Sequence, residues 1–404
     1  MVQGTALTMG AVLGTGVISV PALAAGVAGP ASLVSWLCLI LLSIPLAATF
    51  AALGARHPDG GGVATFARRA FGDSAGTVIG WTFYAAVPLG ATPAAGFAGA
   101  YVADAVGGGR ETTLLVAGLM IVGVATMNWF GLRLSGRVQL VISGALALLL
   151  VVATVVALPQ ADLHRLTPFA PHGWGAVGPA AALLVWAFAG WEAVTPLSGE
   201  YRSPRTDIPR ATALALGIIA VLYLGLAAAT VLVLGPDAGP APLSDLLVLG
   251  FGEGARPVTT VVAVLLSVGA MNTYFAGAAR LGSALGRDGS LPAWLGRGSE
   301  AGQVPRRSLL VSTGLCMLVL AVITVAGLDS GATMLPATGA FTLVYVIGTA
   351  TAVKLLPRGS WVRRGAMLSF VATLVLCWLI GWSLLGAVVI SGAALLWSAR
   401  RRAA

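Results

Sequence analysis

A single carboxylate, Glu192, lies in the middle of an otherwise uncharged apolar run at residues 177–197. An ionisable group at membrane depth is costly and usually faces a cavity or the interior of a helix bundle, so it marks a functional site. Gly190 and Pro196 flank this carboxylate, and both residue types weaken helical hydrogen bonding. The run is therefore predicted to break near Glu192, which a bilayer tolerates only where the freed backbone is buried in protein or lines a wet cavity.

A second interruption of the same kind lies near the N-terminus. Gly16 precedes Pro21 by five residues, as Gly190 precedes Pro196 by six. Corresponding Gly/Pro interruptions in two halves of a membrane protein indicate a transporter built from inverted repeats, with its site at the midplane between them. The predicted divisions are a first five-helix repeat at 1–158, a second at 159–354, and two C-terminal helices with a basic tail at 355–404.

The composition places both breaks in a membrane. Of 404 residues, 58% are hydrophobic and 9% are charged, and the mean hydropathy is +0.94, as in a polytopic membrane protein. A spanning helix needs about 20 apolar residues, and the runs are apolar on every side, unlike the alternating strands of a β-barrel. Twelve helical spans are predicted, at 5–25, 31–54, 74–103, 112–129, 137–158, 176–198, 208–234, 256–285, 308–327, 331–353, 365–381 and 383–398.

The basic residues predict the orientation. With the N-terminus inside, all but three of the 23 Lys and Arg residues fall in cytoplasmic segments, and the exceptions are Arg110, Arg165 and Arg256. This skew places both termini in the cytoplasm. It also explains the net charge of +9 as basic residues at the inner surface, which gives a nucleic-acid partner little support.

The cysteines carry no redox or metal chemistry in this interpretation. Cys38, Cys316 and Cys377 lie within predicted spans without metal-ligand spacing, so they are expected to pack as small apolar residues. No metal and no cofactor is predicted. The N-terminal run lacks a basic start and carries central glycines, so it is expected to be a retained span, not a signal peptide.

Several motifs resemble the amino acid–polyamine–organocation superfamily. They are Gly-Thr-Gly-Val-Ile-Ser-Val-Pro at 14–21, Gly-Gly-Gly-Val-Ala-Thr-Phe-Ala-Arg at 60–68, Trp-Ala-Phe-Ala-Gly-Trp-Glu at 186–192, and parts of 200–210 and 280–292. Within that superfamily, residues 14–24, 61–64 and 80–83 are similar to the bacterial methionine and branched-chain amino acid exporters. The resemblance covers essentially the whole chain. It implies a fold like that of LeuT, the bacterial inner membrane, and export of neutral amino acids.

Two departures from the resemblance limit what is carried over. His57 and Asp59 stand in the loop between spans two and three, where relatives usually have an aromatic and a small residue. The fifth span, at 138–158, has no lysine. Some proton-coupled relatives place a lysine there against the first-span break, so that coupling scheme is not transferred.

An amino acid presents a carboxylate and an ammonium group, and each break offers a match. Backbone N–H groups around Gly14, Thr15 and Gly16, at the positive end of a half-helix, suit the carboxylate. Carbonyl groups freed in the sixth span suit the ammonium, at Phe188, Ala189, Gly190 and Trp191. The alternative for the glycines alone is a patch for close helix packing.

Four further side chains complete the predicted site. The resemblance implies a proton-coupling or gating role for Glu192, and it implies that Trp186 covers the substrate. Ser267 and Asn272 in the eighth span are polar candidates for the lining, whereas Asn128 is assigned a structural role. Because the spans offer no other central charge, an uncharged and apolar substrate side chain fits best.

Several alternatives stay open at this point. A sodium site would want several hard oxygen ligands, and Ser267 is followed by Val268, so proton coupling is favoured. The direction of transport rests on the resemblance, and uptake, exchange, or a cationic amino acid or amine substrate are alternatives. An enzyme would need a constellation of acid, base or metal ligands, and a channel would need a repeated ring of ligands; neither pattern is present.

Overall fold

The computed structural model describes residue 9 and residues 12–56, 62–131, 136–194, 203–297 and 304–403. Over these ranges the protein is all-helical, as predicted, and every predicted span overlaps a helix. The main helices are α2 (Val20–Ala28), α3 (Ser32–Arg56), α4 (Gly62–Phe71), α5 (Asp73–Val106), α6 (Arg110–Trp129), α7 (Gly136–Ala157), α8 (Val177–Leu184), α9 (Pro204–Ala229), α10 (Pro242–Phe251), α11 (Ala255–Arg287), α12 (Arg306–Ala326), α13 (Ser330–Leu355), α14 (Trp361–Ile380) and α15 (Leu385–Ala403).

Some of the predicted features lie outside the described residues. They are the start of the first span, the loop with His57 and Asp59, and Pro196 with the connector after it. Among the described residues, eight helical stretches are long and apolar enough to cross a membrane, and two of them, Val20–Arg56 and Trp361–Arg401, contain two helices each. The count of twelve crossings stays a prediction.

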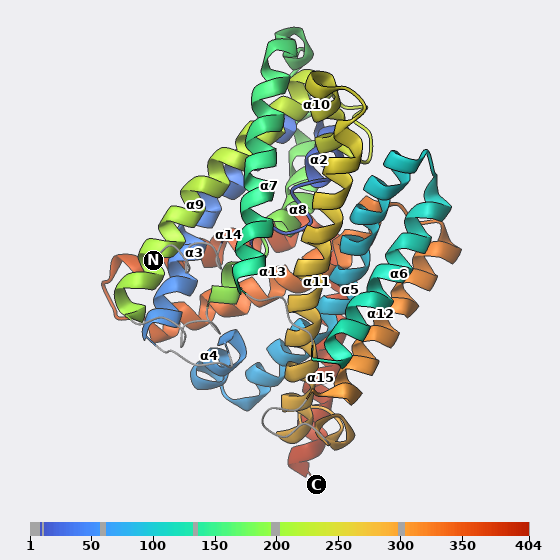
Figure 1. The fold of residues 1–404 in the computed structure, drawn as a ribbon. Helices are drawn as coiled ribbons and strands as arrows, with labels where there is room; N and C mark the ends of the chain where they lie inside the picture. Colours follow the sequence, from blue (N-terminus) through green and yellow to red (C-terminus); the bar gives the residue numbers. More distant parts are fainter. Residues whose placement is uncertain are drawn as a thin grey trace.

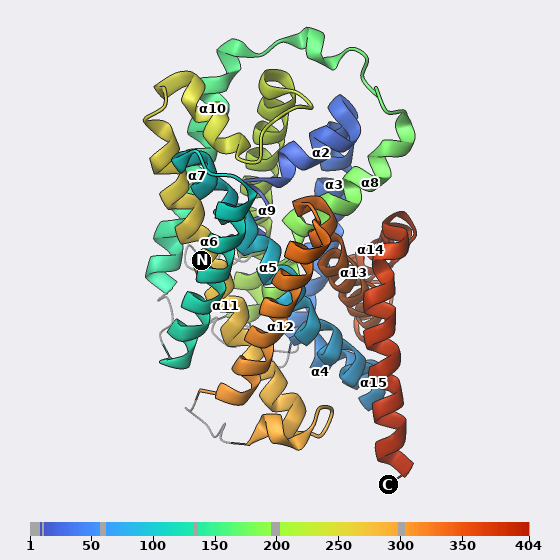
Figure 2. The same cartoon turned by 90° about the vertical axis from the view of Figure 1, so that its right-hand side faces the viewer.

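The long helices form one bundle (Figures 1 and 2). Helix α5 packs against α6 and α11, α3 packs against α9, and α13 packs against α14. Helix α10 and the connection from α7 to α8 lie at one end of the bundle, and the C-terminus lies at the other. We call these the α10 end and the C-terminal end. The positive-inside prediction places the C-terminal end in the cytoplasm.

Two short helices occupy segments that the hydropathy pattern assigned to connectors. Helix α4 buries Val63 and Phe66 and exposes Arg68 and Arg69, so it is amphipathic and lies near the C-terminal end. Helix α10 begins with Pro242 and has Asp245 in its first turn, which are residues that favour helix starts. Neither helix is long enough to be recognised as a span.

The C-terminal helix holds the end of α11 against α5. Trp397 Nε1 on α15 donates to the Gly289 carbonyl (3.0 Å), and Arg401 Nη1 donates to the Asp288 carbonyl (2.8 Å). From the other side, Trp81 Nε1 on α5 donates to the Ser290 carbonyl (2.6 Å). Residues 288–290 are thereby fixed between two helices, and the rings of Trp81 and Trp397 lie 6.2 Å apart.

Candidate functional site

The first span is broken where the glycine motif predicts. Residues 13–19 are not helical, and α2 begins at Val20 with Pro21 in its first turn. Val20 N–H donates to the Gly16 carbonyl (2.8 Å), so the chain turns back into a helix directly after the glycines. Because the segment is buried, its peptide groups face other parts of the protein and not lipid.

The sixth span is broken at Ala189 and Gly190. Helix α8 continues as a tighter 3₁₀ turn over Val185–Phe188, Ala189 is extended, and a new 3₁₀ turn covers Trp191–Val194. Gly190 has φ +127°, a backbone conformation that residues with a Cβ rarely adopt. The glycine is therefore what permits the break at this point.

The side chain of Glu192 folds back onto the break in its own span and also reaches α13. Its Oε2 atom accepts hydrogen bonds from Gly190 N–H (3.0 Å) and from the Tyr345 hydroxyl on α13 (2.7 Å). The residue is only 2% exposed. A buried carboxylate needs such donors, because an unsatisfied charge in an apolar interior is expensive. Glu192 thus connects the broken sixth span to α13, a helix far away in the sequence.

The two breaks are also joined by a tyrosine. The hydroxyl of Tyr223 on α9 lies 3.0 Å from the Val12 carbonyl of the first span and 2.9 Å from the Ala187 carbonyl of the sixth. The residue is fully buried. One phenol therefore serves carbonyl groups that both broken spans leave without helical partners.

Trp186 lies against Gly16 of the broken first span and Gly90 of α5. A Cβ on Gly16 would meet Trp186 Cδ1 at 2.5 Å, and a Cβ on Gly90 of α5 would meet Trp186 Cη2 at 2.8 Å. The indole also meets Phe341 of α13 edge to face, with ring centroids 6.2 Å apart. The indole fits at this position only because Gly16 and Gly90 have no side chains.

A cavity of about 40 Å³ lies between these elements. A water molecule needs roughly 10–15 Å³ by this measure, so the space holds only a few waters and a larger ligand would require the helices to part. None of the described residues that line it is charged. They are Val12, Gly14, Thr15 and Gly16 of the first span, Ala86, Val87, Gly90, Ala91 and Ala94 of α5, Trp186 and Ala189 of the sixth span, Ala270, Met271 and Tyr274 of α11, and Phe341 of α13.

The structure brings together part of the predicted site and places other members elsewhere. Gly14, Thr15, Gly16, Trp186 and Ala189 line the cavity. Gly190 and Trp191 are buried in the break just beyond it.

Three predicted residues point to other neighbours. Phe188 packs on Trp36 and Tyr223, with ring centroids 5.9 and 5.3 Å apart. Asn272 Oδ1 accepts a hydrogen bond from Asn128 Nδ2 of α6 (2.6 Å), so this amide oxygen is bound to a neighbouring helix. Ser267 is fully buried one helical turn before Met271 and is not among the lining residues.

Sequence inspection did not single out the tyrosines or the α5 wall. Tyr223 and Tyr345 form hydrogen bonds with residues more than 30 and 150 positions away, respectively, so no local pattern in the sequence marks them. The small residues of α5 recur at 86, 90 and 94, which is a helical spacing that places them on one face. That recurrence is the one signal by which the wall could have been found.

Two broken helices that meet at an uncharged cavity inside a bundle of apolar helices define a membrane transport protein. Comparison with known proteins agrees. The family model described as "Amino acid permease" matches residues 1–399. The chain is 34% identical to the L-methionine/branched-chain amino acid exporter YjeH of Escherichia coli, over 96% of this chain and 93% of that protein.

Other relatives give the same class. The chain is 33% identical to the uncharacterized amino acid permease YecA of Bacillus subtilis, over 97% of this chain and 93% of that protein. It is 27% identical to the branched-chain amino acid permease BcaP of the same species, over 72% and 68%. This chain belongs to the amino acid permease family of the amino acid–polyamine–organocation superfamily, and it is a transporter and not an enzyme.

Proposed function

We propose that this protein exports neutral, apolar L-amino acids, namely methionine, leucine, isoleucine and valine, by proton-coupled alternating access. The observation that carries this proposal is the cavity between the two breaks, whose described lining is uncharged and mostly apolar, with Thr15 and Tyr274 as its hydroxyl-bearing members. An apolar side chain gains free energy on entering such a lining, whereas a charged one would lose its hydration without a partner. The activity for which YjeH of Escherichia coli is named supports the same substrates.

In this proposal the first-span break binds the substrate carboxylate and the sixth-span break binds the ammonium. Gly14, Thr15 and Gly16 line the cavity beside α2, whose positive end favours an anion. Ala189 lines it at the sixth-span break. Trp186, which also lines the cavity, covers the side chain of the substrate amino acid, and an apolar side chain packs well against its indole ring.

Glu192 is proposed to be the proton-carrying group. It is the one acid in the sixth-span run, and its bond to Tyr345 ties the break to α13. A carboxyl that gains and loses a proton would make and break this tie as the cavity changes sides. The inner-membrane location, the cytoplasmic termini and the two inverted repeats, 1–158 and 159–354, belong to the same proposal.

Counterflow into liposomes tests the substrate class. Purified protein in liposomes preloaded with unlabelled methionine should accumulate labelled methionine or leucine saturably, since a carrier shows trans-stimulation and a channel does not. Excess isoleucine should compete, and excess arginine should not. Gly16→Val should show no counterflow. Gly96→Ala is its matched glycine control, because a Cβ at Gly96 meets no atom within 4 Å. Competition by arginine or a polyamine without competition by methionine would refute the proposed class.

Direction and coupling need a separate measurement. Cells that express the protein should lose preloaded methionine faster than cells without it, and a proton uncoupler should remove the difference. Faster accumulation with unchanged efflux would indicate uptake instead.

A further inference from the structure

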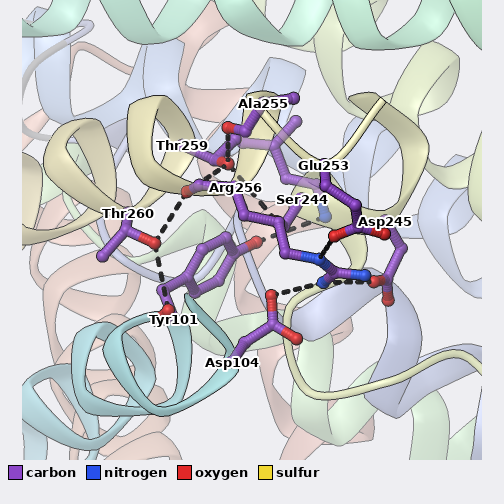
Figure 3. Close-up of polar contacts among 10 residues, drawn as sticks. Tyr101, Asp104, Ser244, Asp245, Glu253, Ala255, Arg256, Thr259 and Thr260 are labelled. Atoms are coloured by element: carbon purple, nitrogen blue, oxygen red, sulfur yellow. Dashed lines mark hydrogen bonds and ion pairs between the residues drawn. The ribbon is translucent and has the colours of Figure 1, made fainter. Parts of the chain in front are cut away.

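Arg256 lies among three acidic side chains where α5, α10 and α11 meet (Figure 3). Arg256 Nη1, in the first turn of α11, lies 2.6 Å from Asp104 Oδ2 at the end of α5 and 3.4 Å from Asp245 Oδ1 on α10. Its Nε atom lies 2.5 Å from Glu253 Oε2 in the connector before α11. The side chains of Arg256, Asp104 and Asp245 are 24, 22 and 27% exposed, so water screens these charges only in part.

Tyr101, at the same end of α5 as Asp104, joins α10 to the broken first span by hydrogen bonds. Its hydroxyl donates to the Ile18 carbonyl (2.6 Å), two residues before α2, and accepts from Leu243 N–H (3.2 Å) in the first turn of α10. Thr260 of α11 donates to the Tyr101 carbonyl (3.0 Å). Tyr101 lies one helical turn before Asp104 on α5, so both connections start from the same end of that helix.

These contacts join elements that alternating access would have to separate. The cavity has room for only a few waters, so a substrate that leaves toward the α10 end needs the first span and α10 to move from α5 and α11. Arg256 is the cation that both Asp104 and Asp245 share. If α10 moves away, the Asp245 contact is lost, and if α5 and α11 part, the Asp104 contact is lost.

We propose that Arg256 is the outer lock of the transporter: it holds α10 and the end of α5 against α11, and it must release Asp104 and Asp245 for the cavity to open toward the α10 end. With the orientation proposed above, this is the external side. The lock is distinct from the substrate contacts, because none of its members lines the cavity.

Removing the charge of Arg256 and removing the charge of Asp245 should have opposite effects on the stability of the closed arrangement. Removal of the Arg256 cation leaves three carboxylates close together without compensation, which strongly disfavours the closed arrangement. Removal of the Asp245 charge has a different result. Burial, followed by the neighbouring Asp104, raises the pKa of Asp245. Its ionised form is therefore a net cost in the closed arrangement, in spite of the contact with Arg256.

Cysteine accessibility tests the lock without any assumption about the substrate. Ala94 lines the cavity from α5 and is 5% exposed. Ala94→Cys would be placed in a protein whose Cys38, Cys316 and Cys377 are replaced by alanine, and it would be labelled with a membrane-impermeant methanethiosulfonate. Arg256→Gln should raise the labelling rate from the α10 side by about tenfold or more. Arg256→Lys keeps the charge but loses the planar group that reaches Glu253 and both aspartates at once, so it should raise the labelling rate less than Arg256→Gln does.

The matched control is Arg110→Gln. Arg110 begins α6, six residues after Asp104, so it also lies at the α10 end of the bundle, and its guanidinium donates to the carbonyl groups of Ile323, Gly327 and Leu328, which carry no full charge. Its labelling rate should equal that of the parent. Asp245→Asn should give labelling slower than the parental rate, in the direction opposite to Arg256→Gln.

The outcomes separate the proposal from misfolding. If Arg256→Gln does not fold, Asp104→Asn removes the shortest contact of the arginine and should raise labelling by about threefold. Parental labelling rates in folded Arg256→Gln and Asp104→Asn would overturn the lock. Faster labelling only from the C-terminal end would also overturn the lock, because the cavity would then have opened at the end opposite to Arg256.

Discussion

The hydroxyl of Tyr345 donates a 2.7 Å hydrogen bond to Glu192 Oε2, and both residues are almost fully buried. The bond joins α13 to the break in the sixth span, and Gly190 N–H donates to the same oxygen (3.0 Å). A proton on Glu192 would alter one tie between two helices that both contribute to the cavity wall. This relationship leads to the first two predictions.

Tyr345→Phe should slow transport by about tenfold or more. A hydrogen bond to a charged group is worth about 1.5–3 kcal/mol, and its loss leaves the buried carboxylate with fewer donors. Initial rates of methionine counterflow in liposomes measure the effect. Tyr84→Phe is the control, because that buried hydroxyl donates to the Ser308 carbonyl (3.0 Å) on α12 and does not contact Glu192. Equal losses in both variants would indicate a general cost of removing a phenol.

Glu192→Gln should keep substrate binding and remove the pH dependence of transport. The glutamine oxygen can still accept from Gly190 and Tyr345, whereas the amide does not titrate. Wild type and variant would be compared across a pH series with a fixed substrate gradient. Matching pH profiles would exclude Glu192 as the titrating group, and a loss of binding would make the carboxylate a direct ligand.

Substitutions at Gly16 and Gly90 should differ in severity. A Cβ at Gly16 meets both Trp186 Cδ1 (2.5 Å) and the backbone Cα of Ala187 (3.1 Å), whereas a Cβ at Gly90 meets the outer edge of the Trp186 ring and no backbone atom within 4 Å. Gly16→Val should therefore abolish binding while the protein still inserts, and Gly90→Ala should weaken binding by about tenfold. Equilibrium binding of labelled methionine to purified protein measures both.

A smaller ring should rescue only the second of these variants. Gly90→Ala with Trp186→Phe should bind better than Gly90→Ala alone, since the phenyl ring leaves room for the methyl group. Gly16→Val with Trp186→Phe should stay inactive, because the Ala187 backbone still obstructs it. Unchanged affinity in well-folded Gly16→Val would favour a packing role for the glycine motif.

Acid on the α10 side should favour the closed lock. In the closed arrangement burial raises the pKa of Asp245, and in an open arrangement the exposed carboxyl would return toward its ordinary value. The closed state therefore binds the proton more tightly and gains stability as the pH falls through the raised pKa. The charged groups that face Asp245 are Asp104, Glu253 and Arg256, and Arg256 keeps its charge throughout.

The measurement is the labelling rate of Ala94→Cys at about pH 5 and about pH 8, divided by the rate of a fully exposed cysteine to remove the pH dependence of the reagent. The ratio should be lower at the acidic pH. Asp245→Asn should give the same ratio at both pH values. A ratio that rises in acid would show that another group governs opening.

Trp397→Phe should destabilise the protein by about 1 kcal/mol, because it removes the hydrogen bond to the Gly289 carbonyl while most of the ring contact with Trp81 is kept. Thermal unfolding in detergent measures the change. Trp378→Phe is the control: that side chain on α14 is 80% exposed, so its replacement should leave the unfolding temperature unchanged. An equal effect of both substitutions would show that α15 does not hold the end of α11.

The sequence by itself determined the membrane class, the approximate ranges of the long helices and the two breaks. Long apolar runs form helices in lipid because a single segment can satisfy its own backbone hydrogen bonds there only as a helix. Glycine and proline interrupt such a helix locally. Gly14, Thr15, Gly16 and Ala189 were predicted from such local patterns, and the family resemblance implied Trp186; all five line the cavity. Each of these inferences depends on residues within one span.

The tertiary structure decided the partners. Tyr345 meets Glu192 across 153 positions, Arg256 meets Asp104 across 152, and Asn272 pairs with Asn128 across 144, away from the cavity where it had been expected. Helical periodicity gives the face on which a side chain lies, but the neighbour of that face depends on how the helices pack. For this reason the apolar pattern predicted where the spans break, and only the packing of α5, α11 and α13 determined what surrounds the breaks.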